Sequence, residues 1–106
     1  MIRERMHATV RDLEAWNEYL SLVRDIDEVQ AAAGRTTSSG VWTQLVGPYN
    51  EIVVELDYPD LATYESDTRA TMSDPQVVKL ASRFESLTLA DKGYNELFVS
   101  ADPVVA

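Results

Sequence analysis

The sequence contains no cysteine and a single histidine among its 106 residues. The absence of cysteine excludes disulfides, thiolate zinc sites, iron–sulfur clusters and cysteine nucleophiles. It also fits a reducing compartment, so we expect a cytoplasmic protein. A single histidine excludes a histidine-rich metal site, and an all-carboxylate site would have to tolerate Arg3 and Arg5 nearby. We therefore predict no metal and no other cofactor.

Long apolar runs and positive charges are also scarce. No window approaches the roughly 20 apolar residues that a membrane span needs, and the N-terminus has no apolar signal segment. Nine Lys and Arg residues stand against 18 Asp and Glu residues, which gives a net charge of -9. Such an excess of negative charge repels phosphate backbones and anionic lipids. Neither nucleic acid nor a membrane is therefore predicted as a partner.

The four glycines do not form a recognisable catalytic or phosphate-binding motif. A nucleophile elbow and a phosphate loop both need closely spaced glycines before a helix. The Ser-Ser-Gly segment at residues 38–40 has neither the spacing nor the helix. Serine hydrolase and nucleotide-binding functions are disfavoured.

A chain of this length forms one domain, which we assign to residues 1–100, with residues 101–106 as a C-terminal tail. Alternation of apolar and polar residues predicts strands at residues 2–10, 36–46, 50–58 and 94–100. The second and third strands meet at a turn formed by Gly47 and Pro48.

Helical spacing and capping residues predict helices between these strands. The N-caps are Asp12, Asp60 and Asp74, and the helices end at Gly34, near Met72 and at about Leu87. The apolar stripe of the first helix contains Leu13, Trp16, Leu20 and Val23, which places Tyr19 and Asp27 on its solvated surface.

The element order β-α-β-β-α-β predicts an α+β protein with the ferredoxin-like fold. We expect a four-stranded antiparallel sheet in the order 4-1-3-2, with helices on one face because crossovers are right-handed. Glu4 is the one charged residue of the first strand on its apolar side. The face that meets the helices is predicted to carry Met6, Val10, Ile52, Val54, Leu56, Leu97 and Val99.

The opposite sheet face mixes charged and aromatic residues. It is predicted to carry Arg3, Arg5, His7, Trp42, Gln44, Glu51, Val53, Glu55, Tyr94, Glu96 and Phe98. An exposed apolar patch of this kind usually marks an interface, and opposite charges on neighbouring strands partner one another. A second copy of the sheet is the simplest cover, so we predict a homodimer that closes into an α+β barrel.

The segment at residues 41–75 combines several short motifs: Trp42-Thr43, Gly47, Asn50, the alternation up to Tyr58, Asp60-Leu61, Arg69 and Asp74-Pro75. With these motifs it resembles the NIPSNAP-like members of the dimeric α+β barrel superfamily. Related barrels include the antibiotic-biosynthesis monooxygenases, EthD-like proteins and stress-induced barrel proteins. The resemblance implies a dimeric barrel and allows cofactor-free oxygenation of an aromatic or polyketide-like substrate.

Eight residues of the uncovered face are candidate site residues. The candidates for catalysis are His7 as an acid/base group, Arg5 as a planar donor and Glu55 as an acceptor or base. The candidates for contact with a flat ligand are Trp42, Gln44, Tyr94, Glu96 and Phe98. Each also has a structural alternative, because ion pairs fix the register of two sheets and aromatic residues line dimer seams.

Three functions fit these residues. The first is a homodimer that binds or converts a small organic molecule in a polar barrel cavity. The second is a noncatalytic dimerisation or interaction module, and the third is a cofactor-free monooxygenase in which the substrate supplies the electrons. Haem binding has less support, because His7 is its single available imidazole. Whether the protein is an enzyme is left open by the sequence.

Overall fold

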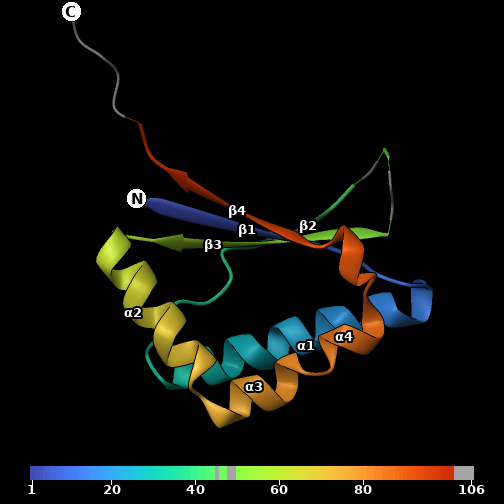
Figure 1. Cartoon of the computed structure of the whole chain (residues 1–106), viewed down its shortest axis with the longest axis horizontal. Helices are drawn as coiled ribbons and strands as arrows, with labels where there is room; N and C mark the ends of the chain where they lie inside the picture. The colour runs from blue at the N-terminus through green and yellow to red at the C-terminus, as the bar shows by residue number, and fades with distance from the viewer. Residues whose placement is uncertain (45, 48–49, 102–106) are drawn as a thin grey trace, which may run out of the picture.

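The computed structural model describes residues 1–44, 46–47 and 50–101 and has one sheet and one layer of helices (Figure 1). The strands are β1 (Ile2–Thr9), β2 (Gly40–Thr43), β3 (Glu51–Tyr58) and β4 (Tyr94–Val99). The helices are α1 (Leu13–Ala32), α2 (Leu61–Met72), α3 (Pro75–Ala81) and α4 (Phe84–Leu87), with a short 3₁₀ turn, η1 (Ala90–Lys92). Residues 102–106 of the predicted tail, and Pro48 of the predicted turn, lie outside the described residues.

The sheet has the predicted topology. Its strand order is β2-β3-β1-β4, and each neighbouring pair is antiparallel. The central strand β1 places Arg5 opposite Glu55 of β3 and opposite Glu96 of β4. The register therefore lines up cations of β1 with carboxylates on both sides, and the ferredoxin-like α+β fold is confirmed.

Local capping explains where the helices begin and end. Asp12 accepts a hydrogen bond from the Ala15 amide, and Asp60 does the same for Thr63, as expected for N-cap carboxylates. The first helix ends as predicted near Gly34, which has a left-handed φ of 72° that costs glycine little.

The single helix predicted between Asp74 and Leu87 is wrong, because the structure divides it into α3 and α4. Asp74 caps α3 and Pro75 occupies its first position, as predicted. After α3 the backbone hydrogen bonds change from the α-helical to the tighter 3₁₀ spacing, since the Arg83 amide donates to the Leu80 carbonyl three residues back. The Ser82 hydroxyl also donates to the Lys79 carbonyl, which is the local competition by which serine interrupts helices.

The second strand is shorter than the predicted residues 36–46. Helix side chains bind the segment before it: Asp67 accepts from the Thr36 amide at 3.0 Å, and Asp27 accepts from the Ser38 amide at 2.8 Å. These amides are therefore used by carboxylates of α1 and α2 rather than by a sheet ladder. Asp27 has this structural role instead of the predicted place on a solvated surface.

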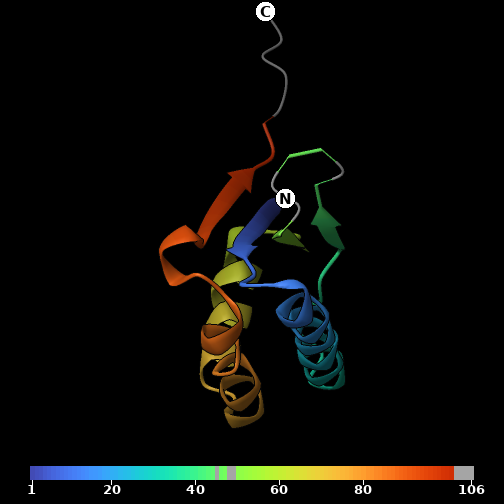
Figure 2. The same cartoon turned by 90° about the vertical axis from the view of Figure 1, so that its right-hand side faces the viewer.

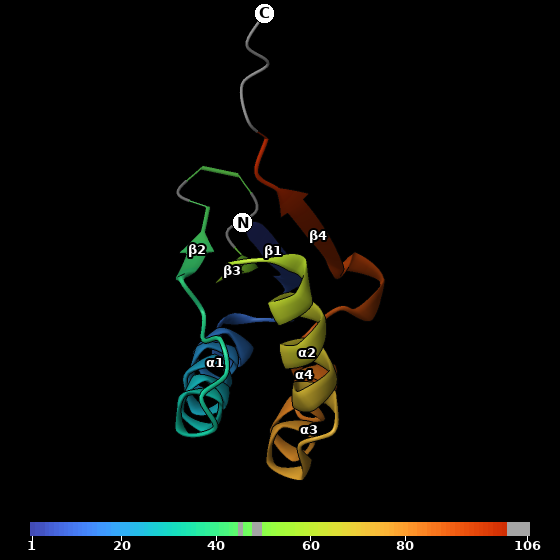
Figure 3. The same cartoon turned by 90° about the vertical axis from the view of Figure 1, so that its left-hand side faces the viewer.

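The hydrophobic core lies between the helices and one face of the sheet (Figures 2 and 3). Every second residue of β3 is buried, as the alternating pattern predicts. From α1 the core takes Tyr19, which is 6% exposed and packs on Phe84 with ring centroids 4.8 Å apart. The prediction that Tyr19 is solvated was wrong, and Leu13 is exposed instead. Burial raises the pKa of Tyr19 to about 12.

Strand β4 is less covered than predicted. Leu97 and Val99 were expected to meet the helices, but they are 52% and 72% exposed. Because β4 is an edge strand with no described helix packed closely against it, both of its faces remain accessible. Among the described residues, no helix is long and apolar enough to cross a membrane.

Candidate functional site

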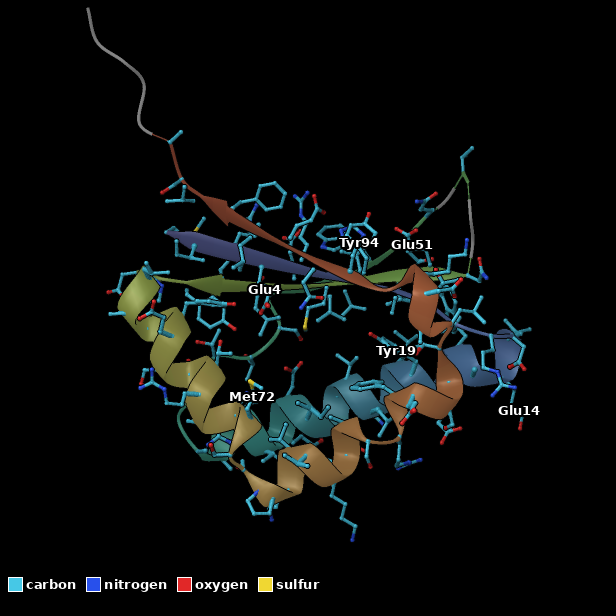
Figure 4. The ribbon with its side chains drawn as sticks, in the orientation of Figure 1. Glu4, Glu14, Tyr19, Glu51, Met72 and Tyr94 are labelled. Atoms are coloured by element: carbon cyan, nitrogen blue, oxygen red, sulfur yellow. The ribbon has the colours of Figure 1, made fainter. Side chains whose placement is uncertain are left out.

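The predicted site residues gather on the sheet face that points away from the helices, which we call the outer face. Figure 4 shows Glu51 and Tyr94 on this side and Glu4 on the helix side. The register places His7 opposite both Val53 and Tyr94, and Trp42 is also opposite Val53. The alternation along each strand therefore brings residues from all four strands onto one surface.

Seven charged or ionisable residues form an ionic strip across the outer face: Arg3, Arg5, His7, Glu51, Glu55, Asp57 and Glu96. Two arginines of the strip bind carboxylates of β3. Arg3 donates from Nε to Asp57 at 2.7 Å and from a terminal nitrogen at 3.2 Å, which forms a fork. Arg5 donates from Nε to Glu55 at 2.9 Å. The hydrogen bond from Arg3 lowers the pKa of Asp57, while Asp57 raises the pKa of Arg3.

His7 is the centre of the strip. Its Nδ1 lies 3.3 Å from Glu51 and its Nε2 lies 2.5 Å from Glu96. Its ring stacks on Tyr94 with centroids 4.1 Å apart, and its side chain is 12% exposed. Two carboxylates are satisfied together when both ring nitrogens donate, which is the imidazolium form. Glu96 is therefore a partner of His7 in this structure, in addition to its predicted place beside a ligand.

Three aromatic residues surround the strip and remain accessible. Trp42 is 58% exposed, and Tyr94 and Phe98 are also exposed. The Arg5 guanidinium carbon lies 5.0 Å from the centroid of the Phe98 ring, which is a cation–π distance. The outer face has a shallow hollow of about 420 Å³ lined by Arg3, Arg5, His7, Trp42, Val53 and Glu55. This hollow has the mixed lining that suits a flat molecule with polar atoms.

The structure brings seven of the eight candidates together and separates the eighth. Gln44 lies beyond the end of β2, and its side-chain amide lies against Gly47 rather than in the hollow. The predicted site did not include Arg3, Glu51 and Asp57, although these residues complete the ion pairs. The alternation of side chains along a strand could have identified them, because all three occupy alternate positions that face the same side as the predicted site residues.

The carboxylates of the strip are used by arginines and by His7 rather than by each other. In the part of the chain that the structure describes, no three His, Asp or Glu residues are arranged to hold a metal ion. The strip is therefore a set of cross-strand ion pairs.

The sequence model of the NIPSNAP family matches residues 10–101. This chain belongs to the NIPSNAP family. The match begins directly after β1 and runs past the end of β4, so it includes the four carboxylates of the ionic strip and not its three members on β1. A comparison with curated proteins gave no significant match.

Solved structures of NIPSNAP proteins share this fold. An uncharacterised NIPSNAP domain protein from Burkholderia xenovorans is 19% identical, covers 100% of both chains and has a TM-score of 0.77. A NIPSNAP family protein from Agrobacterium tumefaciens is 21% identical over 95% of this chain and 93% of its own, with a TM-score of 0.74. An antibiotic biosynthesis monooxygenase is 15% identical over 96% of this chain and 100% of its own, with a TM-score of 0.70. At these identities the likeness shows the fold.

Proposed function

We propose that this NIPSNAP protein is a homodimer that closes two outer faces into an α+β barrel and binds a small organic molecule between them. The observation that carries the proposal is an internally paired ionic strip flanked by exposed aromatic residues on a sheet face without helices. A sheet face that stays in water requires neither exposed aromatic residues nor ion pairs between its charged residues. An interface uses both, because aromatic residues supply apolar contact area and buried charges are costly unless they are paired.

The size of the outer face supports a second copy as its cover. Four strands about 4.8 Å apart and central strands of eight residues at about 3.3 Å each span roughly 19 Å by 26 Å. Because β2 has four residues and β4 has six, two such faces cover at most about 1,000 Å² as flat rectangles, which is roughly the area that a biological interface must reach. The face also carries both signs of charge, so a two-fold related copy meets opposite charges as well as like ones.

Arg5 is the residue that we assign to ligand orientation. Its Nε is bound to Glu55, while its guanidinium plane extends over Phe98 at the edge of the hollow. A guanidinium donates in a planar fork, so the remaining nitrogens suit a carboxylate, phenolate or carbonyl oxygen of a flat molecule. Trp42, Tyr94 and Phe98 supply aromatic surface for stacking. Glu55 and Glu96 are the acceptors next to this position.

The noncatalytic dimerisation module is a second candidate, and the geometry of His7 favours it. Both ring nitrogens of His7 face carboxylates, so a role as general base requires the release of Glu51 or Glu96 first. The cofactor-free monooxygenase is supported by the shared fold of an antibiotic biosynthesis monooxygenase. In that function Glu55 or His7 removes a substrate proton and Arg5 stabilises the resulting oxyanion.

Native mass spectrometry of the freshly purified protein tests the proposal. We expect a dimer that carries the additional mass of a small molecule, since a closed barrel releases its ligand slowly. Arg5→Gln should keep the dimer and lose the additional mass, whereas Arg24→Gln on the exposed surface of α1 should change neither. Trp42→Lys should give a monomer, because it places a charge in the apolar part of the interface.

Results other than a dimer with additional mass would each exclude a part of the proposal. A monomer of the wild-type protein at micromolar concentration would overturn the barrel. A bare dimer that takes up no phenol or carboxylate from a panel of flat aromatic compounds would leave the dimerisation module as the function. Bound ligand without any oxygen consumption would exclude the monooxygenase.

A further inference from the structure

A cavity lies on the other side of the sheet, between β1, β3 and the helices. Its volume is about 200 Å³. Apolar side chains from the sheet and from α1 form its walls: Met6, Val23, Ile26, Val54 and Leu56. A cavity lined by such groups alone stays dry and attracts small apolar molecules.

Glu4 contributes a carboxyl group to this apolar cavity. Figure 4 shows Glu4 on the helix side of the sheet, where the alternation of β1 places it between Ile2 and Met6. Its contact within the chain is a hydrogen bond of 3.4 Å from the Tyr58 hydroxyl, which is long for two oxygens. Among the described residues, no Lys, Arg or His forms a salt bridge with Glu4. Burial raises the pKa of Glu4.

The other polar groups of the cavity are occupied by the protein itself. The Gln30 amide donates to Thr71 at 2.7 Å and accepts from Arg35 at 2.7 Å. Asp27 accepts from the amide and the hydroxyl of Ser38. Glu4 is therefore the carboxyl group of the lining whose contact among the described residues is one long hydrogen bond, which leaves most of its acceptor capacity for a ligand.

The charges around Glu4 favour a cationic donor. Asp27 lines the same cavity, and Asp67 lies close enough to raise the pKa of Tyr58. The cations of β1 point to the outer face, since Arg3 and Arg5 bind Asp57 and Glu55 there. Arg35, a cation that reaches the lining through Gln30, is itself paired with Asp74, so a positive ligand at Glu4 meets a net negative potential.

The dimensions of the cavity limit the size of its ligand. Ligand pockets for drug-sized molecules have volumes of about 300–1,000 Å³, so about 200 Å³ holds a single ring or a short branched chain. Met72 at the end of α2 is exposed and also lines the cavity, which places the opening at this helix (Figure 4). Thr68, one turn earlier, lies beside it.

We propose that this cavity binds a small primary amine with a compact apolar body, whose ammonium group donates to Glu4 and whose body fills the apolar walls. The interaction is a charge-assisted hydrogen bond in a cavity that is partly shielded from water, and it is stronger than a bond between two neutral groups. The cavity lies across the sheet from the outer face. Its occupation is therefore independent of dimer formation and of the ligand proposed there.

Three probes of equal size separate the contribution of charge from that of shape. Benzylamine is cationic, benzyl alcohol is a neutral donor and benzoate is anionic, and all three carry one ring. We expect benzylamine to bind at least roughly tenfold more tightly than benzyl alcohol, as a charge-assisted hydrogen bond predicts, and benzoate not to bind. Titrations followed by NMR measure all three affinities in the same sample.

The three methionines of the chain locate the bound probe. Met6 and Met72 line the cavity, whereas Met1 lines a different hollow with Arg5 and Phe98. With ¹³C-methyl methionine labelling, benzylamine should shift the Met6 and Met72 signals and leave Met1 unchanged. Shifts of Met1 without Met6 would place the amine on the outer face and overturn the proposal.

Two variants complete the test. Glu4→Gln keeps the size of the side chain and should lose the preference for benzylamine while benzyl alcohol still binds; Glu14→Gln at the exposed start of α1 is the control. Thr68→Phe retains Glu4 and fills the opening, so all probes should lose affinity. Equal affinity of wild type and Glu4→Gln for benzylamine, or no binding of benzylamine at millimolar concentration, would contradict the proposal.

Discussion

At the scale of single residues, β1 carries two ionisable groups in opposite situations. His7 on the outer face has a carboxylate on each ring nitrogen and an aromatic ring stacked on its plane. Glu4 on the helix side has one long hydrogen bond from Tyr58. A partly buried carboxyl group with one long hydrogen bond costs stability, so Glu4 contributes little to folding and is free for a use outside it.

Glu4→Gln should stabilise the free protein at neutral pH by roughly 0.5–1 kcal/mol. Burial raises the folded pKa of Glu4 above its ordinary value of 4.5. The folded state therefore holds this proton more tightly, and the unfolding free energy declines as pH rises from 4.5 through the folded pKa. The Glu4→Gln variant should show no such decline in unfolding free energy, because its side-chain amide does not titrate in this pH range. Urea unfolding of both proteins across this pH range measures the difference.

Glu14→Gln serves again as the control, since Glu14 is exposed. A loss of stability in Glu4→Gln at neutral pH would show that the carboxylate is needed for folding.

At the scale of elements, the segment before β2 is held by helices rather than by the sheet. Asp27 of α1 and Asp67 of α2 bind the backbone amides of Ser38 and Thr36. These carboxylates fix the path of the chain along the rim of the internal cavity, which Thr36 and Ser38 also line. The short β2 is the consequence, and its exposed Trp42 remains at the edge of the outer face.

Asp27→Ala should destabilise the protein by about 1–3 kcal/mol, because it removes both hydrogen bonds of Ser38 to α1. Hydrogen exchange should accelerate at the Ser38 amide, while the Thr36 amide, held by Asp67, changes less. Glu28→Ala on the exposed side of the same helix should change neither quantity. Unchanged exchange at Ser38 would show that the sheet alone orders this segment.

At the scale of the whole molecule, the paired carboxylates and the excess of negative charge act in opposite directions. The chain carries a net charge of -9, which opposes compaction at neutral pH. Local pairing offsets this repulsion: Arg3 lowers the pKa of Asp57, and Arg35 lowers the pKa of Asp74. The acidic chain remains folded because its carboxylates are distributed among caps and ion pairs.

Acid should therefore destabilise the protein in a defined window. The folded pKa values of Asp57 and Asp74 lie below their ordinary value of 3.8. The two ionised carboxylates contribute fully to the free energy of unfolding at pH values above their ordinary pKa of 3.8. This contribution is lost as the pH falls through their folded pKa values. Asp74→Asn should make this loss shallower in urea titrations below pH 4.5, roughly where the Glu4 effect begins. A variant with the same slope as wild type would exclude Asp74 as a source of acid sensitivity.

The sequence by itself determined the order of elements, the strand order and the two faces of the sheet. These follow from local quantities: the period of two along Glu51 to Tyr58, and N-cap carboxylates at Asp12, Asp60 and Asp74. The same period of two predicted Arg5 and Glu55 on one face of the sheet, and the register of β1 and β3 places them opposite each other.

Only the tertiary structure decided the features that depend on contacts between distant elements. Tyr19 is buried because Phe84 covers it, and β2 is short because Asp27 and Asp67 bind the segment before it. Leu97 stays exposed because none of the described helices packs closely on the β4 edge. The cavity at Glu4 arises where helices and sheet do not meet fully. A pattern in one segment records which side of an element faces inward, but the distance to the neighbouring element is set by the packing of all of them.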